Sequence, residues 1–256
     1  MHWLIPKFFY RIYEKKLFSE IKNKPVPNHI GIILDGNRRA SKILGLNYED
    51  GYHLGAQKLE DVLGWCWDLG VKVVTCWVFS TENFSRPEDQ VESIMKLAQE
   101  YLIKIREDPR ITKNEVQVKI LGRTQMLPSK VQQEIKITEE NTAKFSNYRL
   151  NICMAYGGRA EIVDALKLIL RKAEAGQIDL NEVDEGLISS HLYTEDMADP
   201  DLVIRTSGEE RLSGFLLWQS AYSEYYFVDV HWPLFRKIDL WRAVRTFQRR
   251  QRRFGQ

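Results

Sequence analysis

The chain has 256 residues, of which 44% are hydrophobic and 28% charged, as is typical of a globular protein with one α/β domain or two small ones. The formal net charge is only +2, so no overall positive field recruits nucleic acid, and we expect no nucleic acid partner. The three cysteines lack metal-ligand spacing and are typical of buried free thiols, which indicates a reducing, cytoplasmic location.

The N-terminal segment 1–27 is predicted to be an amphipathic helical segment that leads into an extended stretch at Pro25 and Pro27. It is too polar for a signal peptide, and no segment has enough consecutive apolar residues to span a bilayer. A helix lying at a membrane surface and a helix packing on the domain both fit this pattern, so peripheral membrane contact is one expectation.

Short apolar runs alternate with helical patterns from residue 30 onward. β-Strands are predicted at residues 30–34, 71–79, 116–121, 150–155, 202–205 and 226–230. Helices are predicted at residues 53–69, 87–107, 129–145, 159–175, 216–222 and 238–252, and a further helix begins at residues 35–37. This alternation predicts an α/β fold, a single domain with a mostly parallel central β-sheet flanked by helices and covered on both faces.

Polar residues gather where the predicted strands end, at residues 35–39, 80–83, 157–159 and 205–208. The carboxyl ends of parallel strands meet at one edge of a sheet, and ligands bind there in such folds. Guanidinium groups suited to phosphate oxygens come from Arg39, Arg86, Arg205 and Arg211. Backbone N–H groups can approach an anion closely at Gly36, Gly158 and Gly208. This edge is predicted to bind more than one phosphate.

Asp35 follows an apolar strand and precedes several cations. Its carboxylate would repel a phosphate unless a metal ion bridged the two groups. Mg²⁺ is usually held by one or two carboxylates together with substrate phosphates, so Asp35 is a candidate ligand and Glu224 a candidate second one. An Asp before a helix is also the pattern of an N-cap, and by pattern alone Glu224 is better explained as a surface residue.

Large apolar side chains surround this edge in the sequence, namely Trp65, Trp67, Trp77, Phe79, Phe84, Leu97, Tyr101, Ile105 and Ile152. Such spacing favours a core over a ligand tunnel. Phosphate sites at the mouth of an apolar crevice would nevertheless suit a lipid diphosphate, so an apolar tunnel beside the sheet is a further expectation. The sequence contains no P-loop, no GxGxxG after the first strand, no HExxH and no GxSxG.

Four long motifs, in this order, resemble those of the cis-prenyltransferases, the undecaprenyl diphosphate synthase family. They are HIGIILDGNRR at 29–39, FSTENFSRP at 79–87, NICMAYGGR at 151–159 and DLVIRTSGEERLS at 201–213. The match continues with FLLWQ at 215–219, Glu224 and RFG at 253–255. The resemblance runs from about residue 28 to the end, so it implies that residues 28–256 form a cis-prenyltransferase catalytic domain.

The resemblance implies a Mg²⁺-dependent, homodimeric transferase. It would condense isopentenyl diphosphate with an allylic prenyl diphosphate, such as farnesyl or geranylgeranyl diphosphate, to give a Z-polyprenyl diphosphate and release diphosphate. The implied catalytic residues are Asp35 and Asn83, and the implied metal ligands are Asp35 and Glu224, the latter usually from the partner subunit's side. The implied substrate-binding residues are Gly36, Asn37, Arg38, Arg39, Phe79, Ser80, Arg86, Arg205, Arg211, Ser213, Arg253 and Gly255.

Some positions depart from the family pattern. Tyr52 stands where members commonly have His, Tyr48 stands near a common Arg, and Ala40 and Ala160 stand where Trp is common. These changes indicate an altered contact to the allylic diphosphate or an altered acceptor.

Other readings of the same residues are a hydrolase, a non-catalytic partner subunit associated with a membrane, and a membrane-surface module. A hydrolase with an Asp-x-Asp-Gly loop would need an acid where this chain has Ile33. Non-catalytic partner subunits tend to lose the acid and arginines of the first motif, whereas this chain keeps Asp35 and Arg39.

Overall fold

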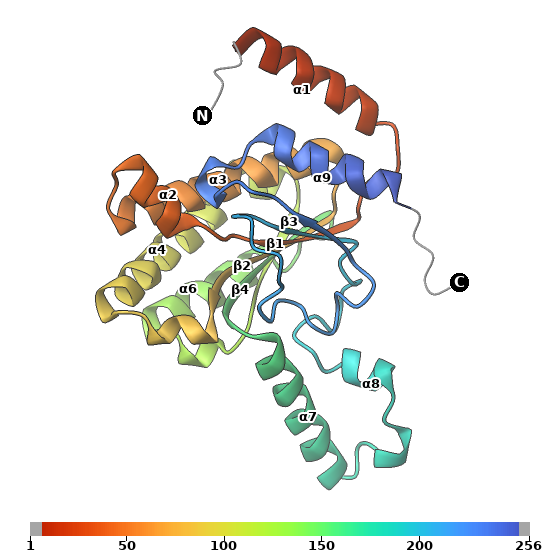
Figure 1. Ribbon diagram of the computed structural model, residues 1–256. Helices are drawn as coiled ribbons and strands as arrows, with labels where there is room; N and C mark the ends of the chain where they lie inside the picture. Colours follow the sequence, from red (N-terminus) through yellow and green to blue (C-terminus); the bar gives the residue numbers. More distant parts are fainter. Residues whose placement is uncertain (1–6, 251–256) are drawn as a thin grey trace.

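A parallel β-sheet forms the centre of the computed structural model, which describes residues 7–250 (Figure 1). Its strands are β1 (His29–Ile33), β2 (Val73–Ser80), β3 (Val116–Leu121), β4 (Tyr148–Tyr156), β5 (Leu202–Arg205) and β6 (Glu224–Phe227). They lie in the order β3-β4-β2-β1-β5-β6, and every neighbouring pair is parallel. The prediction of a mostly parallel sheet flanked by helices is confirmed.

The helices follow the strands closely along the chain. They are α1 (Lys7–Ile21), α2 (Asn37–Leu44), α3 (Tyr48–Leu69), α4 (Glu88–Glu107), α5 (Pro109–Lys113), α6 (Ser129–Thr142), α7 (Gly158–Glu174), α8 (Glu185–Ser189) and α9 (Lys237–Arg249). α3 begins five residues earlier than predicted, because the Asn47 side chain caps it by accepting a hydrogen bond from the Asp50 backbone N–H.

Two predicted elements near the C-terminal end differ in the structure. Residues 216–222 form successive turns rather than a helix, because Gly214 and Leu216 adopt positive φ values of 99° and 44° that a right-handed helix cannot contain. The last strand covers residues 224–227 rather than 226–230. Beyond Phe227 the chain pairs with the loop after β5 instead, through the Ser207 and Gly208 N–H groups.

The two faces of the sheet are covered differently. Alternate side chains such as Ile30 and Ile32 enter a large apolar core with α1, α3, α4, α6 and α9. On the opposite face, Ile33 and Val203 pack against Phe215 and Leu216 of the turn segment. α7 projects away from the sheet, as Figure 1 shows. The large helical core therefore lies on one side of the strands.

The N-terminal helix α1 packs on α9 (Figure 1). Leu17 and Ile21 are buried, and the Phe18 ring lies 5.0 Å from the Trp241 ring of α9. One side of α1 (Lys7–Ile21) is thus part of the core, as expected for a helix that packs on the domain.

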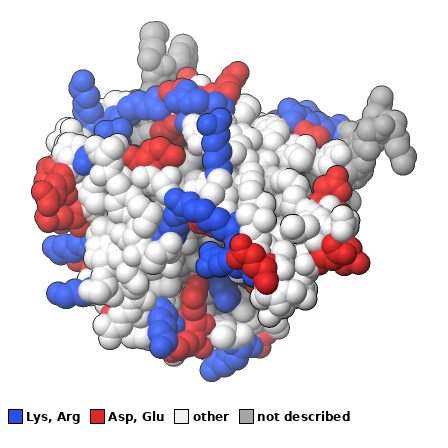
Figure 2. Space-filling view, turned by 90° about the horizontal axis from the view of Figure 1, so that it is seen from below, with Lys and Arg blue, Asp and Glu red and all other residues white. Residues whose placement is uncertain are grey.

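Charge is distributed in small groups over the surface. The face seen in Figure 2 mixes Lys and Arg with Asp and Glu and leaves wide uncharged areas between them. No helix within residues 7–250 is both long and apolar enough to cross a lipid bilayer.

Candidate active site

The predicted polar edge exists, because β1, β2 and β5 end side by side in the sheet. Ile33 of β1 is in register with Trp77 of β2 and with Arg205 of β5. Asp35 comes two residues after the end of β1, and Ser80 is the last residue of β2. The ends of these parallel strands therefore lie together, although Ser80 and Arg205 follow Asp35 by about 45 and 170 residues in the sequence.

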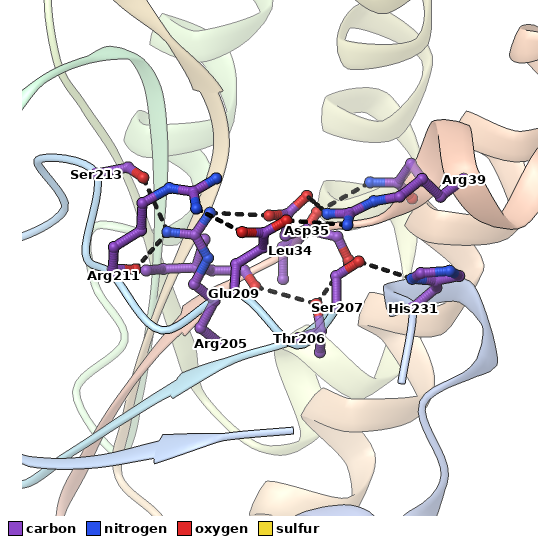
Figure 3. Close-up of polar contacts among 12 residues, drawn as sticks. Leu34, Asp35, Arg39, Arg205, Thr206, Ser207, Glu209, Arg211, Ser213 and His231 are labelled. Carbon is purple, nitrogen blue, oxygen red and sulfur yellow. Dashed lines mark hydrogen bonds and ion pairs between the residues drawn. The ribbon is translucent and has the colours of Figure 1, made fainter. Parts of the chain in front are cut away.

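Asp35 is held between two arginines at this edge (Figure 3). Its Oδ1 accepts a hydrogen bond from Arg39 Nη2 at 3.2 Å, and its Oδ2 accepts one from Arg205 Nη2 at 2.9 Å. Burial acts to raise the pKa of the Asp35 carboxyl, but the hydrogen bonds and charges of Arg205 and Arg39 outweigh it and lower that pKa. Asp35 is therefore an anion at neutral pH and does not act as the N-cap of α2, which is Gly36.

The two arginines belong to a longer chain of charges. Arg39 Nη1 donates to Glu209 Oε1 at 3.0 Å, and Glu209 Oε2 accepts from Arg211. Arg205 Nη1 donates to Ser213 Oγ at 2.8 Å and to the backbone carbonyl of Arg211. Figure 3 shows these side chains converging from α2 and from the loop after β5. The site thus presents guanidinium groups from two segments side by side.

Hydrogen bonds from the segments after β5 and β6 fix the loop between β1 and α2. The Asp35 carbonyl accepts from Thr206 Oγ1 at 2.7 Å and from the Trp232 N–H at 2.9 Å. Gly36 has φ 100°, and a Cβ there would come within 2.7 Å of Ser207 Oγ and 2.9 Å of His231 Nδ1. Only glycine fits this position. The close contact fixes the turn between β1 and α2, and this turn sets the direction of the free N–H groups at the start of α2.

Two glycines let α2 approach α3 closely. A Cβ on Gly51 would lie 1.7 Å from Ser41 Oγ, and a Cβ on Gly55 would lie 2.1 Å from Asn37 Oδ1. Asn37 also donates from Nδ2 to the Leu34 carbonyl at 3.0 Å. The α2–α3 contact therefore sets the position of the Asn37 amide.

The segment after β2 forms the other wall of the site. It is a 3₁₀ turn over Thr81–Ser85, where Asn83 Oδ1 accepts from the Ser80 N–H at 3.1 Å. Phe79 is fully buried. Burial lowers the pKa of the Arg86 guanidinium, which lies beside Tyr52 and Arg38. Asn83 thus holds the turn that carries Ser80.

A cavity of about 1000 Å³ opens at this edge and extends between α3, α4 and the sheet. Its lining brings together the predicted site residues Asp35, Gly36, Asn37, Arg38, Arg39, Phe79, Ser80, Asn83, Arg86, Arg205, Arg211 and Ser213, most of them polar or charged. Its apolar part is lined by Leu59 of α3, by Leu97, Tyr101 and Ile105 of α4, and by Ile152 and Met154 of β4. From Leu97 to Ile105 the helix advances about 12 Å, so the cavity is a deep apolar channel with a cationic mouth.

Two residues that line the cavity have a side-chain polar atom that is buried without a hydrogen-bond partner within the described chain. These atoms are Asn37 Oδ1 and Arg205 Nε. Buried polar atoms are normally satisfied, so these atoms leave hydrogen-bonding capacity for a bound molecule. Tyr52, which stands where the family commonly has His, and Tyr48, which stands near a common Arg, both line the cavity. Two of the four departures from the family pattern therefore lie inside the site, whereas Ala40 and Ala160 are not among the residues that line the cavity.

Some predicted residues lie elsewhere. Gly158 and Gly208 use their N–H groups on the carbonyls of Gly214 and Val228, so neither N–H is free for an anion. Glu224 begins β6, opposite Leu202 at the amino end of β5, and pairs with Arg250. One chain therefore does not bring Glu224 to Asp35. Arg253 and Gly255 lie outside the described residues.

A magnesium ion at this site would depend on few protein ligands. Within residues 7–250 no group of three or more His, Cys, Asp or Glu side chains is placed to hold a metal ion. Asp35 is an ionised, part-exposed carboxylate beside the cavity mouth. This fits Mg²⁺, which is commonly held by one or two carboxylates plus substrate phosphates and water.

Two features of the site were not singled out from the sequence. Glu209 was part of a motif without an assigned role, yet it connects Arg39 and Arg211. His231 belongs to none of the four long motifs, yet it shares a 2.7 Å hydrogen bond with Ser207 (Figure 3), and both side chains lie against Gly36. An acid two residues before Arg211 was a usable signal for Glu209, whereas no local pattern marks His231.

Comparisons with known proteins agree with this geometry. Residues 33–255 match the family model described as "Putative undecaprenyl diphosphate synthase". The chain belongs to the undecaprenyl diphosphate synthase family.

Curated relatives extend this match over nearly the whole chain. The chain is 50% identical over 245 residues to the tritrans,polycis-undecaprenyl-diphosphate synthase (geranylgeranyl-diphosphate specific) of Thermoplasma volcanium, covering 96% of this chain and 95% of that protein. It is 52% identical over 250 residues to an isoprenyl transferase of Thermus thermophilus, again covering 96% and 95%.

A solved family structure shares the fold. Lavandulyl diphosphate synthase from Lavandula x intermedia, in complex with dimethylallyl diphosphate, superimposes with a TM-score of 0.86 at 32% identity. The alignment covers 90% of this chain and 99% of the lavender enzyme. The resemblance predicted from the four motifs is confirmed, and this undecaprenyl diphosphate synthase family member has the fold expected for it.

Proposed function

We propose that the chain is a Mg²⁺-dependent cis-prenyltransferase that condenses isopentenyl diphosphate with an allylic prenyl diphosphate to give a Z-polyprenyl diphosphate. Its family membership makes it a prenyltransferase. The observation that carries the proposed chemistry is the arginine-rich mouth, centred on Asp35, of an apolar cavity of about 1000 Å³. Diphosphates match such a mouth, and prenyl tails match such an interior.

Two anions would share this mouth. The allylic diphosphate would take Arg39 and the free N–H groups at the start of α2, where the helix dipole favours negative charge. Isopentenyl diphosphate would take Arg205, Arg211 and Ser213 of the loop after β5. Because these segments follow adjacent strands, the two substrates would lie side by side with their tails in the cavity.

The reaction breaks one C–O bond and forms one C–C bond. As the allylic C–O bond breaks, Arg39 and its neighbours would stabilise the charge that grows on the departing diphosphate. The isopentenyl double bond attacks the allylic carbon, and loss of one proton from the isopentenyl unit gives the new cis double bond. Asn37 Oδ1 is buried, unpartnered and beside the cavity, so we assign it to orienting the substrates at this step.

Mg²⁺, held by Asp35 with diphosphate oxygens, would supply further positive charge to the leaving group. Arg205 would keep the Asp35 carboxylate ionised and in place through its 2.9 Å hydrogen bond. We also propose a homodimer, in which Glu224, Arg253 and Gly255 serve the site of the other subunit; Glu224 lies too far along the sheet to serve its own. Sedimentation of the purified protein tests the assembly.

The preferred primer is proposed to be geranylgeranyl diphosphate. The Thermoplasma volcanium relative carries that specificity in its name. Incubation with labelled isopentenyl diphosphate, Mg²⁺ and primers of different length, followed by mass analysis, tests both the activity and the primer. Absence of chain extension with every primer would refute the proposed function.

The role of Asp35 is tested by Asp35→Asn, which keeps the side-chain shape but removes the charge. We expect condensation to fall about a hundredfold or more, because the carboxylate both binds Mg²⁺ and orients Arg39. The melting temperature should fall as well, because the buried Arg205 loses its charged partner, so activity is compared at a temperature where the variant is folded. Near-full activity in this variant, measured at saturating Mg²⁺, would remove Asp35 from the metal site.

A further inference from the structure

Glu209 holds one arginine from each of the two proposed diphosphate sites (Figure 3). Its Oε1 accepts from Arg39 Nη1 at 3.0 Å, and its Oε2 accepts from Arg211. Arg39 lies on α2 after β1, and Arg211 lies in the loop after the neighbouring strand β5. A single carboxylate therefore occupies both guanidinium groups where two diphosphates would need them.

These ion pairs are suited to exchange. The side chains of Arg211, Arg39 and Glu209 are 61%, 46% and 29% exposed, and ion pairs between exposed groups contribute little to stability. The Asp35–Arg205 pair differs, because the Arg205 side chain is only 5% exposed and has further partners. A diphosphate carries more charge than a carboxylate and can bind arginine in a bidentate manner, so it would displace Glu209 and leave Arg205 in place.

We propose that Glu209 is a resident counter-anion that exchanges with the substrate diphosphates, taking up Arg39 and Arg211 whenever a diphosphate leaves. This inference rests on the proposed condensation. Hydrogen bonds from Arg211 and Arg39 lower the pKa of the Glu209 carboxyl, so it is available as an anion. Glu209 is a positioning residue in this scheme, since it acts through the two arginines.

Repeated chain extension would require this exchange of anions at the two arginines. The allylic diphosphate departs in each condensation, and the lengthened product keeps the diphosphate that entered with the isopentenyl unit. A further round requires that group to move from the Arg211 side of the mouth to the Arg39 side. Glu209 already touches both arginines, so it can neutralise whichever guanidinium the moving diphosphate has left.

The test compares Glu209→Gln with wild type and with Glu210→Gln, an equally conservative change at the exposed neighbouring residue. Inorganic diphosphate is the probe, titrated calorimetrically into each protein with Mg²⁺ present. We expect Glu209→Gln to bind diphosphate about threefold to tenfold more tightly, because the resident competitor is gone. Glu210→Gln should bind as wild type does. Unchanged or weaker binding in Glu209→Gln would overturn the proposal.

Steady-state kinetics add a readout that a purely structural role would not move. In Glu209→Gln the KM of both substrates should fall together and kcat should fall as well, because diphosphate leaves more slowly. A raised KM would mean that Glu209 instead holds the arginines in their productive positions, and the exchange would be refuted. The diphosphate titration needs no condensation, so a failure of the proposed activity in wild type is seen separately from the effect of Glu209.

Discussion

The buried residue His29 illustrates how a motif position can serve stability. Its Nδ1 hydrogen-bonds the Ala198 carbonyl and its Nε2 hydrogen-bonds Thr75 Oγ1, both at 2.8 Å. Thr75 Oγ1 also accepts from Asn151 Nδ2 at 2.9 Å. This network ties β1, β2 and β4 together beneath the site. Because both ring nitrogens are hydrogen-bonded and the side chain is buried away from solvent, the neutral imidazole is the favoured form.

We expect the protein to lose stability in mild acid because of His29. Burial lowers the pKa of His29 to about 4, while an unfolded chain has a histidine pKa near 6.5. Between these values the unfolded state binds one more proton, so the free energy of unfolding decreases as the pH falls from about 6.5 to about 4, by up to about 3 kcal/mol. Urea unfolding of wild type and His29→Gln across this range measures the effect. The variant should show a flatter profile, and parallel profiles would contradict the assignment.

Residue types at the cavity mouth were predictable because each has a chemical reason to be there. Asp35, Arg39 and Arg205 follow strand ends, and parallel strands end together. The partners of those residues were not predictable. Whether Glu209 points at an arginine or at solvent, and whether His231 reaches Ser207, depends on side-chain packing across residues far apart in sequence.

At the scale of elements, the contact between α2 and α3 controls the site through glycine. Gly55→Ala would place a Cβ 2.1 Å from Asn37 Oδ1, so the Asn37 amide would have to move. We expect condensation to fall about tenfold or more, and stability to fall by about 1–3 kcal/mol from the crowding. Activity assays and thermal unfolding measure the two effects.

Gly64→Ala on the same helix is the matched control, because within residues 7–250 no atom beyond the local backbone of α3 lies within 4 Å of a Cβ there. Replacing this part-exposed helical glycine by alanine should stabilise the protein by about 0.5–1 kcal/mol and leave activity unchanged. Equal effects of Gly55→Ala and Gly64→Ala would rule out a positioning role for the close contact.

The order of the elements was predictable because apolar runs and helical patterns alternate with clear boundaries, as at Gly70, which ends α3 in a left-handed conformation. The expected helix at 216–222 was wrong because its composition is helical while its backbone is not. Leu216 adopts φ 44° and packs with Phe215 against the sheet. Tertiary packing overrides local propensity at this segment.

For the whole molecule, the position of α1 decides how membrane contact can be tested. Leu17 and Ile21 are buried against the domain, whereas Phe9 and Ile12 are 59% and 48% exposed. We propose that the outer side of α1, with the exposed cations Arg11, Lys15 and Lys16, touches anionic lipid.

The double variant Phe9→Ser, Ile12→Ser should lower flotation with anionic liposomes and lower the melting temperature less than a substitution on the buried side of α1 does. Leu17→Ala is the contrasting control. It should lower stability by about 2–5 kcal/mol, because it leaves a cavity between α1 and α9. Equal flotation of wild type and the double variant would show that α1 does not provide the membrane contact.

The loop after β5 carries an unusual backbone. Ser207, Ser213 and Leu216 have φ values of 80°, 52° and 44°, interleaved with Gly208 and Gly214 in the same left-handed region. Each non-glycine residue of this kind costs about 1–2 kcal/mol. The surrounding fold stabilises this backbone in the structure without a ligand, so the anion-binding loop is preorganised. Binding of an anion therefore needs little free energy for ordering the loop.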